Sequence, residues 1–222
     1  MNNGTPIHRH LDPGDSLGEV LFGLIMALTV TLGARLAATS APLNVHQLIA
    51  TIIGCNLAWG VIDAVFFVLG GLFHRSRRAR FYRILKSSGN DVEALAALEE
   101  EFGLEDEPLA VGIQDRATLY RAMLAVTTRA APARARLQPR DFLSAFAVFL
   151  LVSAAALPAV MPFILVEVPD LALHLSNMLQ ILLLFLVGYW WGRYTDANPW
   201  LVGLTIMLLG VAMVSVAIGL GG

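Results

Sequence analysis

Five apolar stretches, each long enough to cross a lipid bilayer, constrain this chain more than any other feature of its sequence. A transmembrane helix needs about 20 mostly apolar residues, and such stretches fall at residues 16–34, 48–72, 142–166, 171–191 and 199–220. Of the 222 residues, 57% are hydrophobic and 14% are charged, a balance too apolar for a water-soluble domain. The sequence therefore predicts an all-α, polytopic membrane protein with five transmembrane helices.

The basic residues are concentrated on one side of the predicted membrane. Of the 15 Lys and Arg residues, 12 lie between Arg75 and Arg140, and only Arg35 falls on the opposite side. Cytoplasmic segments of membrane proteins are enriched in Lys and Arg. We therefore expect a multi-pass protein of a cell (inner) membrane, with the N-terminus and the segment between spans two and three in the cytoplasm and the C-terminus outside.

The predicted organisation has three parts. Residues 1–73 form an N-terminal tail with spans one and two, residues 74–140 a cytoplasmic insert, and residues 141–222 spans three to five. Three helices are expected in the insert: a basic one at 75–86, an acidic amphipathic one at 91–102 and a third at 113–128. An insert of this size has little core of its own, so we expect it to pack on a partner copy or on the membrane face.

Cap residues predict where two of the spans begin. Asp12 precedes Pro13, and Asn198 precedes Pro199. An Asp or Asn followed by Pro at the first helical position is typical of a helix N-terminus. We expect the first span to start near Pro13 and the fifth at Pro199.

Acidic residues in the first span suggest a metal path. A charged side chain at the centre of a membrane helix costs roughly 2.5–3.5 kcal/mol on insertion scales, and Glu19 lies one turn inside the span. Asp12, Asp15, Glu19 and Met26 fall close to one helical stripe. Hard carboxylates followed by a soft thioether favour Fe(II), Mn(II), Co(II) or Zn(II) over Ca(II) or Mg(II). Alternatively, Asp12 and Asp15 only cap the helix and Met26 only fills space in the core.

Polar residues in the second span and the insert extend this hypothesis. Asn56 and Asp63 are seven residues apart and share one helix face, so they either line a polar path or form a structural pair with Asp63 protonated. Glu93 and Glu100 belong to an acidic cluster that collects cations at the cytoplasmic mouth or is simply a solvated helix face. The candidate metal-binding residues are Asp15, Glu19, Met26, Asn56, Asp63, Glu93 and Glu100.

Other classes of function find little support in the sequence. It contains no arrangement of nucleophile and base and no glycine-rich phosphate loop, so we expect neither an enzyme nor catalytic residues. No cofactor is expected beyond a divalent metal carried as substrate, and no nucleic acid is an expected partner. The expected partners are the lipid bilayer, divalent metal ions, protons and a second copy of the chain.

Several local motifs resemble those of the vacuolar iron transporter family. Leu157-Pro158 followed by Pro162-Phe163 looks like that family's third span, and the ending VAMVSVAIGLGG looks like its closing helix. Gly14-Asp15-Ser16 stands where the family has Asn-Asp-Gly, whose Asp is a ligand of the transport path. The resemblance thus implies five spans, a cytoplasmic insert after the second, and a transport-path role for Asp15.

The resemblance also implies a homodimer whose metal path runs between the two copies of span one and is coupled to proton counterflow. Two motifs differ from the family. Its second span carries Met-Ala-x-Gly-Glu, where this chain has Leu57-Ala58-Trp59-Gly60-Val61, so Asp63 is the expected substitute. Its insert begins with a glutamate-studded helix, where this chain has the basic run HRSRRARFYR.

The leading hypothesis is therefore a dimeric transporter of divalent metal cations that exchanges them for protons. Asp15 and Glu19 are the expected entry ligands, and Asp63 is a candidate proton or metal site. Two alternatives remain open: a non-transporting membrane scaffold or interaction protein that presents the insert to a partner, and a transporter of another cation or small solute.

Overall fold

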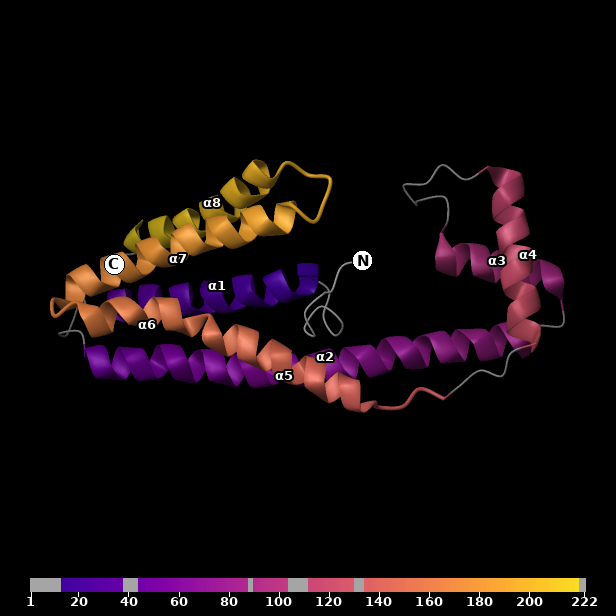
Figure 1. Ribbon diagram of the computed structural model, residues 1–222, viewed down its shortest axis with the longest axis horizontal. Helices are drawn as coiled ribbons and strands as arrows, with labels where there is room; N and C mark the ends of the chain where they lie inside the picture. Colours follow the sequence, from indigo (N-terminus) through magenta and orange to yellow (C-terminus); the bar gives the residue numbers. More distant parts are fainter. Residues whose placement is uncertain (1–12, 38–43, 88–89, 104–111, 130–133, 220–222) are drawn as a thin grey trace, which may run out of the picture. The chain divides into compact units, whose positions relative to one another are not determined.

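The computed structural model describes residues 13–37, 44–87, 90–103, 112–129 and 134–219 (Figure 1). Every regular element in these ranges is a helix. In chain order they are α1 (Pro13–Ala37), α2 (Val45–Ser87), α3 (Asp91–Phe102), α4 (Ile113–Arg129), α5 (Pro139–Ala154), α6 (Ala156–Leu165), α7 (Pro169–Gly192) and α8 (Pro199–Gly219). The chain divides into two compact units: unit 1 comprises Met1–Val68 and Gln138–Gly222, and unit 2 comprises Leu69–Leu137.

Five segments of the described chain have the length and apolar character needed to cross a membrane, as the sequence predicts. They are Pro13–Ala34 in α1, Val45–Ser87 in α2, Pro139–Leu165 in α5 and α6, Pro169–Gly192 in α7, and Pro199–Val216 in α8. The all-α fold and the five spans are thus confirmed, and the protein is a multi-pass membrane protein.

The predicted start of the fifth span is confirmed, because α8 begins at Pro199. α1 is already helical at Pro13, the first described residue of the chain. Asn198 caps α8, because its Oδ1 accepts a hydrogen bond from the backbone N–H of Trp200 at 3.0 Å. Asp12, the predicted cap of the first span, lies outside the described residues.

Two helices differ from the sequence-based expectation. The basic segment expected as a separate helix continues the second span within one 43-residue helix, α2, because no proline interrupts the chain before Ser87. The third span, expected to be continuous, is divided between α5 and α6 at Ala155. Pro158 has no N–H for the carbonyl of Ala154, and its ring crowds that carbonyl, so the helix is interrupted there.

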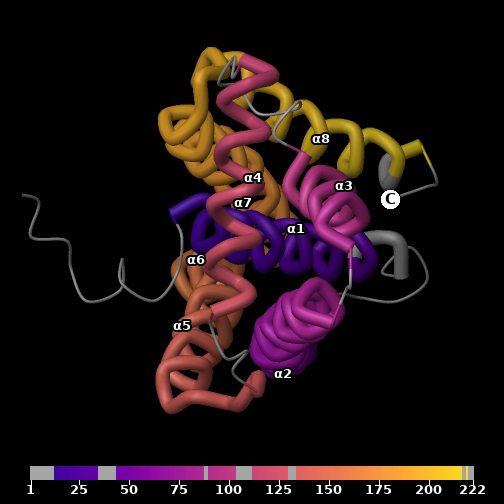
Figure 2. Tube along the Cα trace, turned by 90° about the vertical axis from the view of Figure 1, so that its right-hand side faces the viewer, coloured from indigo at the N-terminus to yellow at the C-terminus, as the bar shows by residue number. Residues whose placement is uncertain are grey.

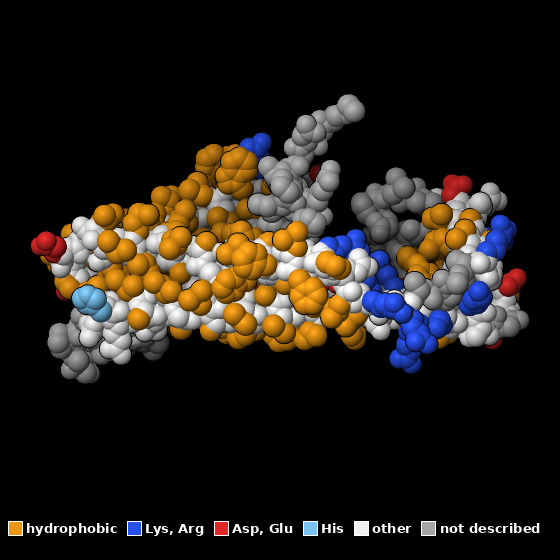
Figure 3. Space-filling model, turned by 60° about the horizontal axis from the view of Figure 1, so that its bottom comes forward, with side chains coloured by type: hydrophobic (Ala, Val, Ile, Leu, Met, Phe, Trp, Pro, Cys, Tyr) orange, Lys and Arg blue, Asp and Glu red, His pale blue; other side chains and the backbone are white. Residues whose placement is uncertain are grey.

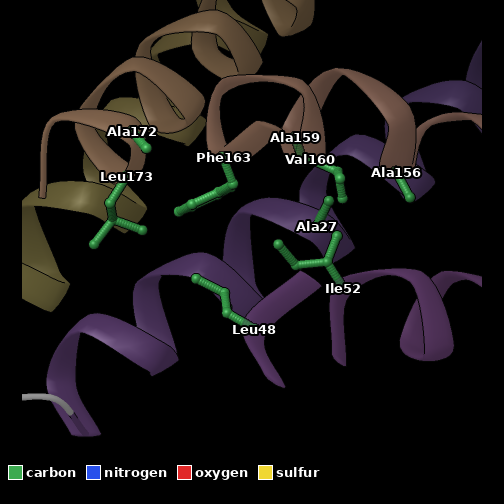
Figure 4. Close-up of a cluster of buried hydrophobic side chains, with 9 residues drawn as sticks. All are labelled: Ala27, Leu48, Ile52, Ala156, Ala159, Val160, Phe163, Ala172 and Leu173. Carbon is green, nitrogen blue, oxygen red and sulfur yellow. The ribbon is translucent and has the colours of Figure 1, made fainter. Parts of the chain in front are cut away.

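Within unit 1, α1 is the central helix. It packs against α5, α6, α7 and α8, and α7 and α8 lie side by side along most of their length (Figures 1 and 2). Small residues allow these close contacts: a Cβ added at Gly203 of α8 would lie 2.9 Å from the backbone oxygen of Phe185 in α7. One core of buried side chains joins α1, α2, α6 and α7 (Figure 4). It contains Ala27, Leu48, Ile52, Ala156, Ala159, Val160, Phe163, Ala172 and Leu173.

A buried polar cluster lies on α7 in the same unit. The Ser176 hydroxyl donates a hydrogen bond to the backbone oxygen of Ala159 in α6 at 2.7 Å. The Thr31 hydroxyl of α1 donates to Oδ1 of Asn177 at 2.8 Å, and Nε2 of Gln180 donates to the Ser176 hydroxyl oxygen at 3.2 Å. These bonds satisfy polar groups that the bilayer core cannot satisfy, so they tie α7 to α1 and α6.

Unit 2 has a small hydrophobic core of its own. Leu85 at the end of α2 is buried against α3 and α4 in a cluster with Ala94, Leu98, Tyr120 and Leu124. Outside this core, Nη2 of Arg77 in α2 donates hydrogen bonds to both carboxylate oxygens of Glu101 in α3, at 3.1 and 2.9 Å. Asn90 caps the start of α3, and Gly103 ends it with a left-handed φ of 47°.

Candidate metal site

An open hollow lies among α1, α2 and α7 in unit 1. It has a volume of about 520 Å³. The residues that line it are Gly14, Asp15, Gly18, Glu19 and Phe22 from α1, Asp63 and Phe67 from α2, and Trp191 from α7. Because the α1 residues are spaced by about one helical turn, the straight course of α1 turns them all toward the same space.

Three carboxylates line this hollow, although they are not close enough to one another to hold a single metal ion between them. Asp15 is exposed, and Glu19 and Asp63 are half-buried. Glu19 interacts electrostatically with both Asp63 and Asp15, so the three side chains concentrate negative charge between apolar helices. The Oδ2 atom of Asp63 is buried, and no hydrogen-bond donor reaches it from the described residues. A carboxylate group placed in this way is suited to receive a cation or a proton.

Below the hollow, α1 and α2 are held together by direct contacts. The rings of Phe22 and Trp59 meet edge to face, with centroids 5.6 Å apart. The amide Nδ2 of Asn56 donates hydrogen bonds to the backbone oxygens of Gly23 in α1 and Val152 in α5, both at 3.0 Å. These contacts join α1 to α2 about one helical turn from Glu19 and Asp63.

The structure brings together some of the predicted site residues and separates others. Asp15, Glu19 and Asp63 line the hollow, whereas the fully buried Asn56 bonds backbone oxygens at a helix contact. Met26 lies seven residues after Glu19 on α1. It is half-buried and does not line the hollow. A polar path through Asn56 and a sulfur ligand from Met26 therefore stay predictions.

The two candidate metal-binding residues of the insert lie on α3. Glu93 and Glu100 are exposed and, being seven residues apart, share one helix face. Within the described ranges, no group of three or more His, Cys, Asp and Glu side chains is close enough to hold a metal ion. A role for Glu93 and Glu100 in collecting cations stays a prediction.

Sequence reasoning missed the aromatic walls of the hollow. Trp191 fits an interfacial anchor at the end of a span equally well, and Phe22 and Phe67 look like ordinary lipid-facing residues. A usable signal was present, because Phe22 follows Glu19 by three residues and Phe67 follows Asp63 by four. Such spacings place each aromatic ring beside a carboxylate on the same helix face.

The fold and the hollow together define a class: a multi-pass membrane protein with an acid-lined space between its first two spans. Within this class the chain belongs to the VIT family, whose model matches residues 23–222. It is similar to Vacuolar iron transporter 2 of Oryza sativa subsp. japonica, with 22% identity over 224 residues covering 96% of this chain and 89% of the relative. The family resemblance seen in the sequence is thus confirmed. Asp63 lies within the range matched by the family model, and Asp15 and Glu19 precede it.

Proposed function

We propose that this protein transports divalent metal cations across the membrane in exchange for protons. The observation that carries the proposal is the convergence of Asp15, Glu19 and Asp63 on one open hollow between membrane helices. Intramembrane carboxylates are costly and typically mark an ion pathway. Membership of the VIT family and the similarity to a relative named as an iron transporter support the same function.

The size and chemistry of the hollow fit a hydrated cation. Six water molecules occupy about 180 Å³ at roughly 30 Å³ each, which is well below the 520 Å³ of the hollow. A cation could therefore enter with its water shell and exchange part of it for carboxylate oxygens. The carboxylates that line the hollow supply only oxygen ligands. Selectivity for an iron-like metal would therefore require a sulfur ligand in addition, such as Met26.

Proton exchange follows from the same carboxylates. A carboxylate must be deprotonated to bind a metal ion, so metal binding is linked to proton release. The closeness of Glu19 to Asp63 and Asp15 makes three simultaneous negative charges unfavourable without a cation. A site of this kind would alternate between a metal-bound and a protonated state.

Transport by the purified protein in liposomes tests this function. We expect Fe(II), Mn(II), Co(II) or Zn(II) to enter vesicles that contain the protein faster than empty vesicles, and a pH gradient to change the rate. Mg(II) and Ca(II) should enter more slowly. If none of the six ions crosses faster than in empty vesicles, the transporter hypothesis is wrong and the scaffold alternative is favoured.

A second copy of the chain would close the open side of the hollow. A Cβ added at Gly18 meets nothing within 4 Å in one chain, so this part of α1 can receive a neighbouring helix closely. Gly18→Leu should therefore lower the fraction of dimers in lipid, measured by subunit counting, while the thermal unfolding midpoint stays within a few degrees of wild type.

Gly54→Leu provides the control for the dimer prediction, because Gly54 on α2 is equally open but does not line the hollow. It should assemble like the wild-type protein. A wild-type protein that is monomeric in lipid, or a Gly18→Leu variant that dimerises normally, would argue against a shared path.

The orientation is proposed from the charge distribution. With the Arg-rich insert in the cytoplasm, five spans place the C-terminus outside. A single cysteine introduced at Ser76, in a background with Cys55 replaced by Ala, should be labelled by an impermeant reagent only after the cells are opened. Labelling of intact cells at this position would reverse the proposed orientation.

A further inference from the structure

The part of α2 in unit 2 carries a concentrated positive charge directly after its last apolar residues. Leu69, Leu72 and Phe73 are followed by a run with six basic side chains, which are Arg75, Arg77, Arg78, Arg80, Arg83 and Lys86. At about 1.5 Å per residue, Phe73 and Arg80 are separated by roughly 10 Å along the helix axis. The first four basic residues therefore lie within about one Debye length of the apolar part of the helix.

Several of these side chains are available to a ligand. Arg78, Arg80 and Arg83 are exposed and form no hydrogen bond or ion pair with any described residue. Arg77, by contrast, is held by Glu101. Figure 3 shows Lys and Arg side chains gathered on the visible face of unit 2, whereas hydrophobic side chains cover that of unit 1.

The fold explains why Arg83 faces outward. Phe81 and Leu85 turn toward the core formed with α3 and α4. Arg83 is two residues from each of them, so the helical rotation of about 100° per residue places it on the opposite side of α2. Arg80 is one turn from Arg83 on the same side, so the packing of unit 2 leaves these two arginines uncovered. Arg78 projects from another side of α2 and is exposed as well.

The segment that leads from the insert into the third span is also basic. Arg134, Arg136 and Arg140 are exposed and flank the start of α5 at Pro139. The chain leaves the membrane after the second span and re-enters it with the third on the same side. Both junctions between membrane and insert therefore carry arginines at the same leaflet.

We propose that the exposed basic residues at each of these two junctions bind the headgroups of anionic phospholipids. The guanidinium group of Arg matches phosphate oxygens in a bidentate arrangement, and basic clusters next to a membrane helix are attracted to anionic leaflets. A basic surface of this kind repels metal cations, so it is unsuited to collecting them. The inference does not depend on metal transport.

The test is lipid retention by the purified full-length protein. The protein is mixed with equal amounts of phosphatidylglycerol and phosphatidylcholine of the same chain length, and the bound lipids are counted by native mass spectrometry. We expect preferential retention of phosphatidylglycerol. At about 1 kcal/mol for each basic residue near the surface, R78Q/R80Q should lower that preference by roughly thirtyfold.

Three controls make the result specific. R78K/R80K keeps the charge and should retain most of the preference. R121Q/R129Q removes the same charge from exposed positions on α4 and should also retain it. Inorganic phosphate should displace phosphatidylglycerol no better than sodium chloride of equal ionic strength. If R78Q/R80Q aggregates on size exclusion, R80Q/R83Q serves for the same comparison.

Each contrary outcome overturns the proposal. If the wild-type protein retains the two lipids equally, the proposal is wrong, and a soluble acidic partner is favoured for these arginines. If R78Q/R80Q and R121Q/R129Q lose the preference for phosphatidylglycerol equally, the preference depends only on net charge. Stronger displacement by inorganic phosphate would indicate a soluble phosphate ligand in place of a lipid.

Discussion

Glu19→Gln should abolish most metal flux into liposomes while leaving the protein folded and assembled. The amide keeps the shape of the side chain but cannot supply the charge that offsets a partly dehydrated cation. Contacts to a charged group are worth about 1.5–3 kcal/mol, so the flux at low metal concentration should fall by one to two orders of magnitude. Metal-dependent fluorescence in vesicles measures the flux, and size exclusion and thermal unfolding measure assembly and folding.

Glu167→Gln is the matched control for this prediction, because Glu167 is exposed and does not line the hollow. Its flux should equal that of the wild-type protein. An unchanged flux in Glu19→Gln would mean that the carboxylate is structural, and the metal-proton exchange hypothesis would then fail at this residue.

Asp63→Asn separates the two roles that are open to the second intramembrane carboxylate. If Asp63 holds the exchanged proton, metal binding survives in the variant, and the dependence of flux on a pH gradient disappears. If Asp63 is a metal ligand, binding weakens along with flux. Isothermal calorimetry and the flux assay distinguish these cases when they are applied to the same preparation.

Gly23→Ala should lower the thermal unfolding midpoint by roughly 2–12 °C. A Cβ at Gly23 would lie 2.6 Å from the Ala155 Cβ and 2.8 Å from the Val152 backbone oxygen, so α1 and α5 must move apart. Overpacking typically costs about 1–3 kcal/mol, and each kcal/mol shifts the midpoint by about 2–4 °C for a chain of this size. The displacement also disturbs the hydrogen bond from Asn56 to the Gly23 backbone oxygen.

The control for this variant lies on the same helix. A Cβ at Gly33 meets nothing within 4 Å, and Ala favours a helix over Gly, so Gly33→Ala should keep or raise the midpoint. Equal midpoints for wild type and Gly23→Ala would mean that α1 and α5 do not pack as closely as the structure has them.

The membrane part of the fold could be predicted from the sequence because it depends on local properties. Apolar runs of sufficient length give the five spans, and the pair Asn198-Pro199 gives the start of α8. The division of the third span was missed although Pro158 was visible, because a membrane helix often accommodates a proline. Whether Pro158 interrupts the helix depends on whether neighbouring groups donate a hydrogen bond to the carbonyl of Ala154, which loses its helical partner.

Part of the candidate site could be predicted, because acidic residues are rare within apolar membrane helices. Glu19 and Asp63 stood out as acids within apolar runs, and both line the hollow. Asn56 was harder to interpret, because an amide on a helix face can serve a path or a helix contact. Only the tertiary structure shows its Nδ2 bonded to two backbone oxygens on other helices.

The polar cluster on α7 has a consequence for the order in which the protein is built. Ser176 and Asn177 find their partners on Ala159 and Thr31, which both precede α7 in the chain. During synthesis these partners are already made when α7 emerges, so its polar side need not stay unpaired in lipid. A circular permutation that moved α7 ahead of α1 would deprive the nascent helix of both partners.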